Sequence, residues 1–464
     1  MTTSLRPLID DLRALVGDDA CRTDADTRAL HSVDALKHDG HLPDAVVFPA
    51  TTADVAGVVR ACARHRVPMV PRGAGTGYTG GAVPVRGGVV ISLARLDRLL
   101  EIDEDNLLAV VEPNLVTGHL QRAVEAVGLF YPPDPASLDE SAIGGNIAEC
   151  AGGPRAFKYG TTRRYVLAIE AVLPNGDVVR TGSKAVKNVV GYDLTGLLVG
   201  SEGTLAIVTQ ATLRLVPLPP CRETLRATFA SVADAARAVS TIVRARVVPA
   251  ALELVDAVSL DAVARHLGRR WAPAGTAAML LVEVDGVEVT VADERTRVVA
   301  ACQAAGALDI VIARSAEERD ELWTARRALS PALRSLAPLK INHDVVVPKG
   351  RVPALFALIE ELRRQSGLPM PCFGHAGDGN IHVNVMIDPG APGDAERAER
   401  IQRQLFEGVV ALEGSISGEH GIGFTKAPYL PIELTPATIA LMRRVKAAFD
   451  PEGLLNPGKI FPEE

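Results

Sequence analysis

Three glycine-rich segments in the first half of the chain constrain its fold more than any other feature. They are PRGAGTGYTGGAVP at 71–84, SAIGGNIAECAGGPRAFKYGTTRRYV at 141–166 and GYDLTGLLVGSEGTLAIVT at 191–209. Because glycine lacks a Cβ, the backbone of such a segment approaches a ligand closely, and consecutive N–H groups can surround an anion such as a pyrophosphate. Three of them in this order indicate a fold that lays a long dinucleotide against main chain.

The first segment matches the Gly-x-Gly-x-x-Gly spacing of a Rossmann fingerprint at Gly75, Gly77 and Gly80. That fingerprint requires a helix to begin at its last glycine. Here the chain continues with more glycine and with proline over 81–88, so no helix can form there. We therefore reject a Rossmann domain that binds NAD and keep a loop that binds phosphate groups through its backbone.

Strand and helix patterns alternate on both sides of a proline-rich break, VPLPPC at 216–221. The apolar periodicity predicts strand–helix–strand units in the N-terminal half. In the second half it predicts two βαβ units in one sheet with helices on one face, followed by further elements. The predicted elements are strands at 45–48, 67–70, 107–111, 225–230, 251–255, 277–284, 308–313 and 345–347, helices at 232–246, 289–305, 316–336 and 352–364, and a hairpin at 371–387.

Composition narrows the possible functions. Apolar residues make up 47% of the 464 residues and charged residues 23%, values typical of a folded, soluble protein. The net charge of −7 argues against a surface for nucleic acids. The six cysteines form no CxxC pair, which argues against zinc ribbons and iron–sulfur sites and favours free thiols in a reducing compartment. The N-terminus lacks the apolar core of a signal peptide, and no run of 18 apolar residues occurs, so we expect no transmembrane segment.

Histidines gather in GHAGDGNIHVN at 374–384. After the GDGN turn, strand alternation puts His382 and Asn384 on one face, and a hairpin brings His375 close to His382. Asp378 lies within the turn, where we expect it to cap its own backbone and not to bind a metal.

A glutamate and another histidine follow in GEHG at 418–421. Glu419 is a candidate third ligand beside two histidines, and His420 is expected to face the same cavity. Two histidines and a carboxylate suit zinc, with manganese, iron or cobalt as alternatives, and three protein ligands leave a position open for a substrate. The alternative is that these histidines are buried core residues with a structural role.

Together the three glycine-rich segments resemble the FAD-binding domain of the vanillyl-alcohol-oxidase type of flavoprotein. The tail DPEGLLNPGKIF at 450–461 is similar to the C-terminus of that family. More narrowly, the chain from about residue 40 to 461 resembles the FAD-dependent D-2-hydroxyacid dehydrogenases. This group includes D-lactate dehydrogenase, the flavin subunit of glycolate oxidase and D-2-hydroxyglutarate dehydrogenase.

The resemblance implies an α+β fold with a two-subdomain FAD-binding domain, a ferredoxin-like βαβ-repeat cap domain and a C-terminal tail that returns to the FAD domain. The expected boundaries are an N-terminal helical segment at 1–43, the FAD-binding domain at 44–218, the cap domain for substrate and metal at 219–430, and the C-terminal segment at 431–464. FAD is expected to be non-covalent because 71–84 contains no histidine. The cofactor-binding residues implied are Pro71, Arg72, Gly73, Gly75, Thr76, Gly77, Gly80, Gly81, Ser141, Gly144, Gly145, Asn146, Ala148, Gly152, Gly153, Tyr159, Gly160, Glu202, Gly203, Ile207 and Asn456.

The resemblance also implies roles for polar residues of the second half. His375, His382 and Glu419 match residues that bind a divalent metal in relatives, and Arg326 matches one that holds the substrate carboxylate. We expect Ser330, one turn later on the same helix face, to assist Arg326. We expect His420 to be the catalytic base and Asn384 to hydrogen-bond the substrate or the flavin.

The predicted reaction is oxidation of a D-2-hydroxy acid to the 2-oxo acid, with metal-assisted hydride transfer to FAD. D-lactate is the leading substrate, because hydroxyglutarate-type enzymes have a lysine where Asn342 stands here, two residues before Asp344, and Lys340 is two residues earlier. Glycolate and D-2-hydroxyglutarate remain alternatives.

Other functions stay open at this point. A metal-free oxidase that reduces O₂, a metal-dependent hydrolase without flavin, and a non-catalytic flavin-binding protein are each consistent with part of the pattern. The sequence does not select among a quinone, a cytochrome and an electron-transfer flavoprotein as the electron acceptor. We expect a cytoplasmic protein, or one peripheral to the inner membrane, and a homodimer.

Overall fold

A computed structural model describes residues 5–35 and 40–463, which form two compact units. Unit 1 contains the described residues up to Gly152, Thr161–Leu218, and those from Glu419 onward. Unit 2 contains Gly153–Gly160 and Pro219–Gly418. Residues 1–4 and 36–39 of the predicted N-terminal helical segment lie outside the described residues. The domain boundaries expected from the sequence stay a prediction.

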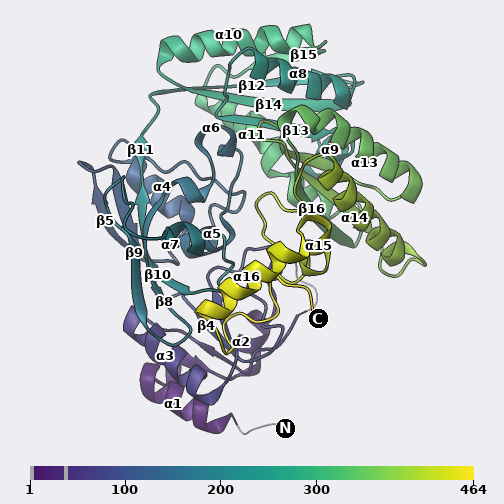
Figure 1. Cartoon of the computed structure of the whole chain (residues 1–464). Coiled ribbons are helices and arrows are strands. Elements are labelled where there is room, and N and C mark those ends of the chain that lie inside the picture. The colour runs from purple at the N-terminus through teal and green to yellow at the C-terminus, as the bar shows by residue number, and fades with distance from the viewer. Residues whose placement is uncertain (1–4, 36–39, 464) are drawn as a thin grey trace. The chain divides into compact units, whose positions relative to one another are not determined.

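The first sheet of unit 1 has the strand order β1-β2-β4-β3. Its last three strands are parallel, and β1 is antiparallel to β2. Buried valines of α3 pack with Leu8 and Leu12 of α1, and Figure 1 shows the two helices side by side. Thr51 caps α3, because its side chain accepts a hydrogen bond from Asp54 N. The elements are β1 (Cys21–Arg22), β2 (Ala45–Val47), β3 (Met69–Arg72), β4 (Val89–Ser92), α1 (Arg6–Val16), α2 (Ala25–Leu30), α3 (Thr52–His65) and the 3₁₀ turn Asp18–Ala20.

The second sheet of unit 1 is antiparallel, with the order β5-β6-β10-β8-β9. The short helices α5 and α7 lie within the second and third glycine-rich segments, and β7 and β11 form a separate two-stranded pair. The elements are β5 (Leu99–Asp103), β6 (Leu108–Val111), β7 (Leu129–Phe130), β8 (Val166–Val172), β9 (Val178–Gly182), β10 (Ile207–Arg214), β11 (Val216–Pro217), α4 (Thr117–Glu125), α5 (Ile143–Glu149), α7 (Leu194–Leu198) and the 3₁₀ turn Thr162–Arg164.

The C-terminal tail returns to the first sheet of unit 1, as predicted. Met69 N donates to Leu454 O, and Asn456 N donates to Met69 O, so the tail lies beside β3. Lys446 of the preceding helix donates through Nζ to Thr204 O and Leu455 O. The tail elements are the 3₁₀ turn Ala427–Tyr429, α15 (Leu430–Glu433) and α16 (Pro436–Phe449).

Unit 2 is built on one sheet with the order β15-β12-β14-β13-β17-β18-β16, in which all neighbours are antiparallel. Its first four strands have the ferredoxin-like order 4-1-3-2, with α8 after β12 and α10 after β14, which agrees with the predicted βαβ repeat. The elements are α6 (Ala156–Tyr159), β12 (Cys221–Phe229), α8 (Val232–Arg244), β13 (Ala251–Asp256), α9 (Ala257–Leu267), β14 (Ala278–Gly286), α10 (Glu288–Ala304), β15 (Asp309–Ile312), α11 (Ala316–Arg327), α12 (Leu329–Leu333), β16 (Leu339–Val346), the 3₁₀ turn Lys349–Arg351, α13 (Val352–Ser366), β17 (Cys372–His375), β18 (Asn380–Ile387) and α14 (Asp394–Ala411).

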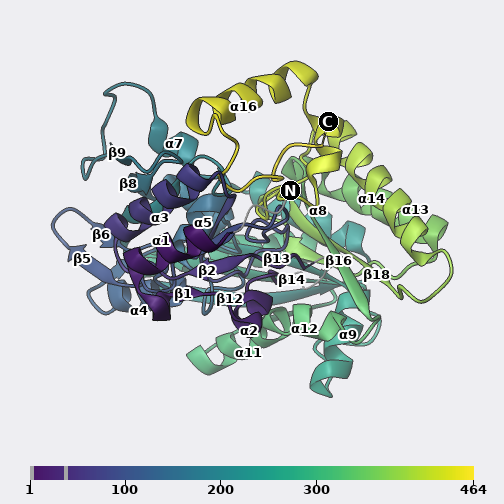
Figure 2. The same ribbon diagram turned by 90° about the horizontal axis from the view of Figure 1, so that it is seen from below.

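The helices of the two predicted βαβ units, α8 and α10, pack together against β12 and β14, which agrees with the prediction of helices on one face. Helices outside these two units also cover the opposite face of the sheet. Figure 2 shows α9, α11 and α12 on one side and α13 and α14 on the other. Val255, Met279 and Phe373 pack with α9, α11 and α12 in one buried cluster. Because these side chains are apolar, helices must pack on this face of the sheet as well to exclude water.

The predicted helix at 316–336 is broken into α11 and α12. Pro331 lacks an N–H, and its ring would clash with the Arg327 carbonyl, so the first helix ends at Arg327. Arg326 and Ser330 therefore lie on different helices, which corrects the expectation of a shared helix face.

Substitution of Gly88 tests how closely two segments of main chain approach each other in unit 1. Gly88 has a φ of +83°, and a Cβ there would lie 2.2 Å from Pro68 O, whereas Gly128 at φ +78° has no atom within 4 Å of such a Cβ. Left-handed φ costs roughly 1–2 kcal/mol in both alanine variants. Gly88→Ala should lose about 2 kcal/mol more than Gly128→Ala, because main chain has to move. Thermal unfolding of the two variants checks this, and equal losses would contradict the close approach at Gly88.

Candidate functional site

One face of the unit 2 sheet carries a row of polar side chains. The register pairs Asp344 of β16 with His382 of β18, and Asn342 with Asn384. Because side chains alternate along a strand, these four residues share a face. The Asn342 amide nitrogen donates to Asn384 Oδ1 at 2.8 Å. The polar residues explain why only 345–347 was predicted as a strand.

The predicted hairpin is formed by β17 and β18, and it brings the two histidines together. The ring centres of His375 and His382 lie 5.4 Å apart in a T-shaped arrangement. Nδ1 of His375 lies 2.6 Å from Glu253 Oε1, and Nδ1 of His382 lies 3.7 Å from Asp344 Oδ1. As expected, Asp378 caps the turn, because its Oδ1 accepts from Asn380 N.

Asp344 is fully buried and fixes the chain just before Glu419. Its Oδ1 accepts from Asn380 Nδ2 at 2.6 Å, and its Oδ2 accepts from Gly418 N at 2.9 Å. Glu419 and His420 are the next two residues. Among the described residues, Asp344, His382, Glu419 and His420 each offer a ligand atom, and these atoms all lie within 4.8 Å of one another.

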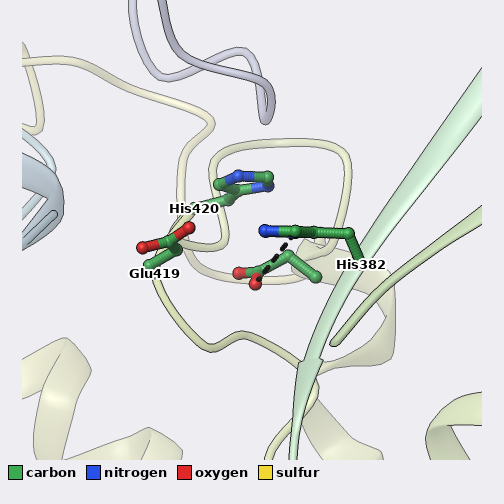
Figure 3. Close-up of side chains that lie close together, drawn as sticks. His382, Glu419 and His420 are labelled. Atoms are coloured by element: carbon green, nitrogen blue, oxygen red, sulfur yellow. Dashed lines mark ion pairs between the residues drawn. The ribbon is translucent and has the colours of Figure 1, made fainter. Parts of the chain in front are cut away.

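Figure 3 shows the imidazole of His382 pointing toward His420 and Glu419. Such a set of nitrogen and carboxylate ligands suits a divalent metal. His375 is adjacent to His382 but is not a member of this group of four. The predicted ligand set His375, His382 and Glu419 therefore stays a prediction, with Asp344 as an additional candidate.

In unit 1, the first glycine-rich segment holds His420. The Tyr78 ring stacks on the imidazole with a centre-to-centre distance of 5.4 Å, and Thr79 Oγ1 donates to His420 O at 3.0 Å. The Glu202 carboxylate accepts from Ile422 N and Gly423 N. Glu202, predicted as a cofactor residue, thus uses its side chain to hold the segment that follows His420.

The predicted substrate residues of unit 2 all have protein partners. Arg326 is 8% exposed, and its Nε donates to Glu253 Oε2 at 2.5 Å. Ser330 Oγ accepts from Lys340 Nζ at 2.8 Å. Burial lowers the pKa of Lys340 to about 8, and the charge of Arg334 contributes. Asn384 is fully buried, and its Nδ2 donates to Pro371 O.

Most of the predicted cofactor residues converge within unit 1. A Cβ at Gly73 would lie 3.4 Å from Ala142 Cβ and 3.8 Å from Gly145 N, so the first two glycine-rich segments touch. Asn456 Nδ2 donates to both Gly81 O and Glu202 O. The third segment and the tail therefore join the first. Gly153, Tyr159 and Gly160 belong to unit 2, where the Tyr159 hydroxyl donates to Asp285 Oδ2.

The convergent segments fit a dinucleotide. Gly75 and Gly80 have φ values of +73° and +80°, and no atom lies within 4 Å of a Cβ placed at Gly77 or Gly145. Buried Asn114 Oδ1 is 3.9 Å from a Cβ at Gly73 and has no hydrogen-bond partner among the described residues. Main chain with free space beside it allows FAD to approach closely, and the buried Asn114 Oδ1 is available to accept a hydrogen bond from the cofactor.

Two family models match the chain. The FAD binding domain matches residues 43–182, and the C-terminal domain of FAD linked oxidases matches residues 218–460. The chain belongs to the FAD-linked oxidases. This membership confirms the resemblance and the expected flavoenzyme class.

Curated relatives of this FAD-linked oxidase match over nearly the whole chain. The glycolate oxidase subunit GlcD of Bacillus subtilis is 43% identical and covers 94% of this chain and 93% of its own. D-2-hydroxyglutarate dehydrogenase of Stutzerimonas stutzeri is 36% identical over 98% of both chains. D-lactate dehydrogenase of Archaeoglobus fulgidus is 36% identical over 89% of this chain and 90% of its own.

Solved structures confirm the fold. p-Cresol methylhydroxylase has a TM-score of 0.82 at 19% identity and covers 99% of this chain and 97% of its own. 4-Ethylphenol oxidase from Gulosibacter chungangensis has a TM-score of 0.80 at 21% identity, with 100% and 98% covered. Both support the predicted α+β fold of the vanillyl-alcohol-oxidase type. Across the described residues of the oxidase, no helix combines the length and the apolar character needed to cross a membrane.

The carboxyl groups of Glu149 and Glu202 in unit 1 predict that the stability of the protein depends on pH. Burial raises the pKa of Glu149 well above its usual value, the charges of Glu202 and Asp34 raise it further, and Lys426 opposes them. The folded protein therefore holds a proton that the unfolded chain releases, and its stability falls as pH rises above the unfolded pKa of about 4.3.

Glu149→Gln removes this effect. We expect the variant to raise the thermal unfolding midpoint more near pH 8 than near pH 5.5. Thermal melts of wild type and variant at both pH values check this. Equal shifts at the two pH values would contradict the raised pKa.

Proposed function

We propose that this FAD-linked oxidase oxidises a D-2-hydroxy acid to the corresponding 2-oxo acid, with a divalent metal at the site. The observation that carries the proposal is the group formed by Asp344, His382, Glu419 and His420, whose ligand atoms lie within 4.8 Å of one another. The names of its relatives, glycolate oxidase subunit, D-2-hydroxyglutarate dehydrogenase and D-lactate dehydrogenase, support the same substrate class.

Three side chains are proposed to hold the metal: His375, His382 and Glu419. Nδ1 of His375 lies 2.6 Å from Glu253 Oε1, which favours the tautomer that presents the Nε2 lone pair of this histidine to a metal. Zinc is the first choice, and manganese, iron and cobalt are alternatives. When bound, the metal would supply the Lewis acidity that lowers the pKa of the substrate hydroxyl, and FAD would supply the acceptor for the α-hydrogen as hydride.

His420 is the proposed base that takes the hydroxyl proton, a contribution of roughly 10²–10⁴-fold in rate. Its stacking on Tyr78 and the bond from Thr79 to its carbonyl restrict its position. Arg326 is proposed to bind the substrate carboxylate. Because its Nε donates to Glu253, its guanidinium plane is fixed for a bidentate pair through the terminal nitrogens. Ser330 and Asn384 stay proposed substrate contacts.

D-lactate is the proposed substrate, with glycolate and D-2-hydroxyglutarate as alternatives. The uncharged Asn342 amide donates to Asn384, so this position supplies no cation for a second carboxylate. All six cysteines are free, which supports a reducing compartment such as the cytoplasm. A quinone, a cytochrome or an electron-transfer flavoprotein as acceptor, and a homodimer, stay predictions.

The visible spectrum of the purified protein tests the reaction class. We expect a flavin absorption band that bleaches when D-lactate is added anaerobically. If only D-2-hydroxyglutarate or glycolate bleaches the flavin, that acid replaces D-lactate as the proposed substrate, and the proposed mechanism is unchanged. A yellow protein that no 2-hydroxy acid bleaches would refute the proposed reaction, and a protein that stays colourless after FAD is added would favour the flavin-free hydrolase.

Two single variants separate the metal from the base. His382→Ala should lose the metal and turnover but retain FAD, because the histidine lies in unit 2 and the predicted FAD segments converge in unit 1. His420→Asn should retain metal and FAD yet reduce flavin roughly 10²–10⁴-fold more slowly. Metal analysis and single-turnover flavin reduction measure both effects. Normal turnover by His382→Ala, or unchanged flavin reduction by His420→Asn, would contradict the assigned role.

A further inference from the structure

Glu253 connects two residues that have separate roles in the proposed site. It lies on β13 and is fully buried. Its Oε1 is 2.6 Å from His375 Nδ1, and its Oε2 accepts from Arg326 Nε at 2.5 Å. One carboxylate thus contacts both a candidate metal ligand and the candidate binder of the substrate carboxylate.

The contact with His375 fixes the chemical state of that imidazole. A carboxylate at Nδ1 favours the tautomer with the proton on Nδ1, so the lone pair is on Nε2, the atom that binds a metal. The sheet register places the two side chains next to each other on one face, because Glu253 and His375 are paired across β13 and β17.

The contact with Arg326 fixes a buried cation. The guanidinium also lies over the Phe373 ring, 4.9 Å from its centre. Burial of such a cation requires a nearby negative charge, and Glu253 supplies it. The bond uses Nε, so it orients the guanidinium plane and with it the two terminal nitrogens.

We propose that Glu253 is a positioning residue that couples metal binding to substrate binding through its two oxygens. The inference rests on the proposed function, since it concerns the same metal and the same 2-hydroxy acid. A single change at Glu253 should weaken two kinds of binding at once. A merely structural residue would affect neither selectively.

Glu253→Gln is the test variant. Glutamine has the same shape but accepts through one oxygen only. Arg326 can only donate and therefore keeps that oxygen, so His375 faces the amide N–H₂ and loses its acceptor, and the negative charge is gone. We expect zinc to bind 10–100-fold more weakly, the range typical when the partner of a metal ligand is removed. We also expect the KM for the 2-hydroxy acid to rise more than kcat falls, with FAD content unchanged.

Glu283→Gln is the matched control. Glu283 lies on the neighbouring strand β14 and is also buried, at 3% exposure. Its Oε2 accepts from Thr224 Oγ1 and from Trp323 Nε1, and neither of these residues has a proposed role in the reaction. This variant should leave zinc affinity and KM within about threefold of wild type.

Zinc affinity is measured on the full-length, FAD-loaded protein by competition with a chromogenic chelator, and KM and kcat by anaerobic flavin reduction. Wild-type zinc affinity and KM in Glu253→Gln would overturn the proposal, as would equal losses in Glu283→Gln. Glu253→Asp keeps the charge with a shorter reach, and it should recover part of both losses. It also serves as the test variant if the glutamine variant does not fold.

A separate measurement distinguishes failure of this proposal from failure of the proposed function. Long-range ¹H–¹⁵N NMR of the histidine rings reports the His375 tautomer without metal or substrate, and a His375→Asn spectrum assigns the signal. We expect the proton on Nδ1 in wild type and a changed tautomer in Glu253→Gln. If wild type binds no metal, the proposed function fails. An unchanged tautomer in Glu253→Gln overturns the positioning role in either case.

Discussion

The hydrogen-bonded register between β16 and β18 decides which polar side chains of unit 2 meet. It pairs Asp344 with His382 and Asn342 with Asn384. A shift by one residue would move each of these side chains to the opposite face of the sheet. Asp344 in turn accepts from the amide of Gly418, the residue before Glu419. Strand pairing therefore fixes the polar face and also anchors the segment that supplies the candidate ligand and the candidate base.

This arrangement buries charged carboxylates, which is unfavourable unless hydrogen-bond partners stabilise them. Nearby residues provide these partners. Glu253 and Asp344 are fully buried, and both oxygens of each carboxylate have donors or a histidine nitrogen within hydrogen-bond distance. Burial raises the pKa of Glu253, but the charges of His375 and Arg326 lower it to about 2, so the carboxylate stays ionised. Such networks contribute more to the precise orientation of functional groups than to stability.

In unit 1 the main constraint is different, because main chain has to lie close to a long cofactor. Its first glycine-rich segment forms a loop over 73–88, as the proline and glycine after Gly80 predicted, and the second and third segments carry the short helices α5 and α7. The loops are joined by short polar contacts, such as those of Asn456 with Gly81 and Glu202. The same loops hold His420, because Tyr78 and Thr79 lie between the glycines of the first segment. The segment predicted to bind the cofactor therefore also positions the proposed base.

The sequence by itself determined the elements with a clear period and the residues with a clear motif. The helices at 232–246 and 289–305, the strands of the βαβ repeat and the hairpin around Asp378 were all predictable, because side-chain period and turn chemistry are local properties. The family followed from the three glycine-rich segments and the tail.

Only the tertiary structure decided the partners of the polar residues. Glu253 lies between two leucines in the strand ALELVD, and a charge among these apolar residues was a signal that was missed. Its partner Arg326 is 73 residues away, and no periodicity links them. The start of β16 at Leu339 was also hidden, because Lys340, Asn342 and Asp344 lack the apolar pattern of a strand. Pairing with β18 stabilises that polar strand, and such long-range pairing depends on where other strands lie, which a local pattern does not encode.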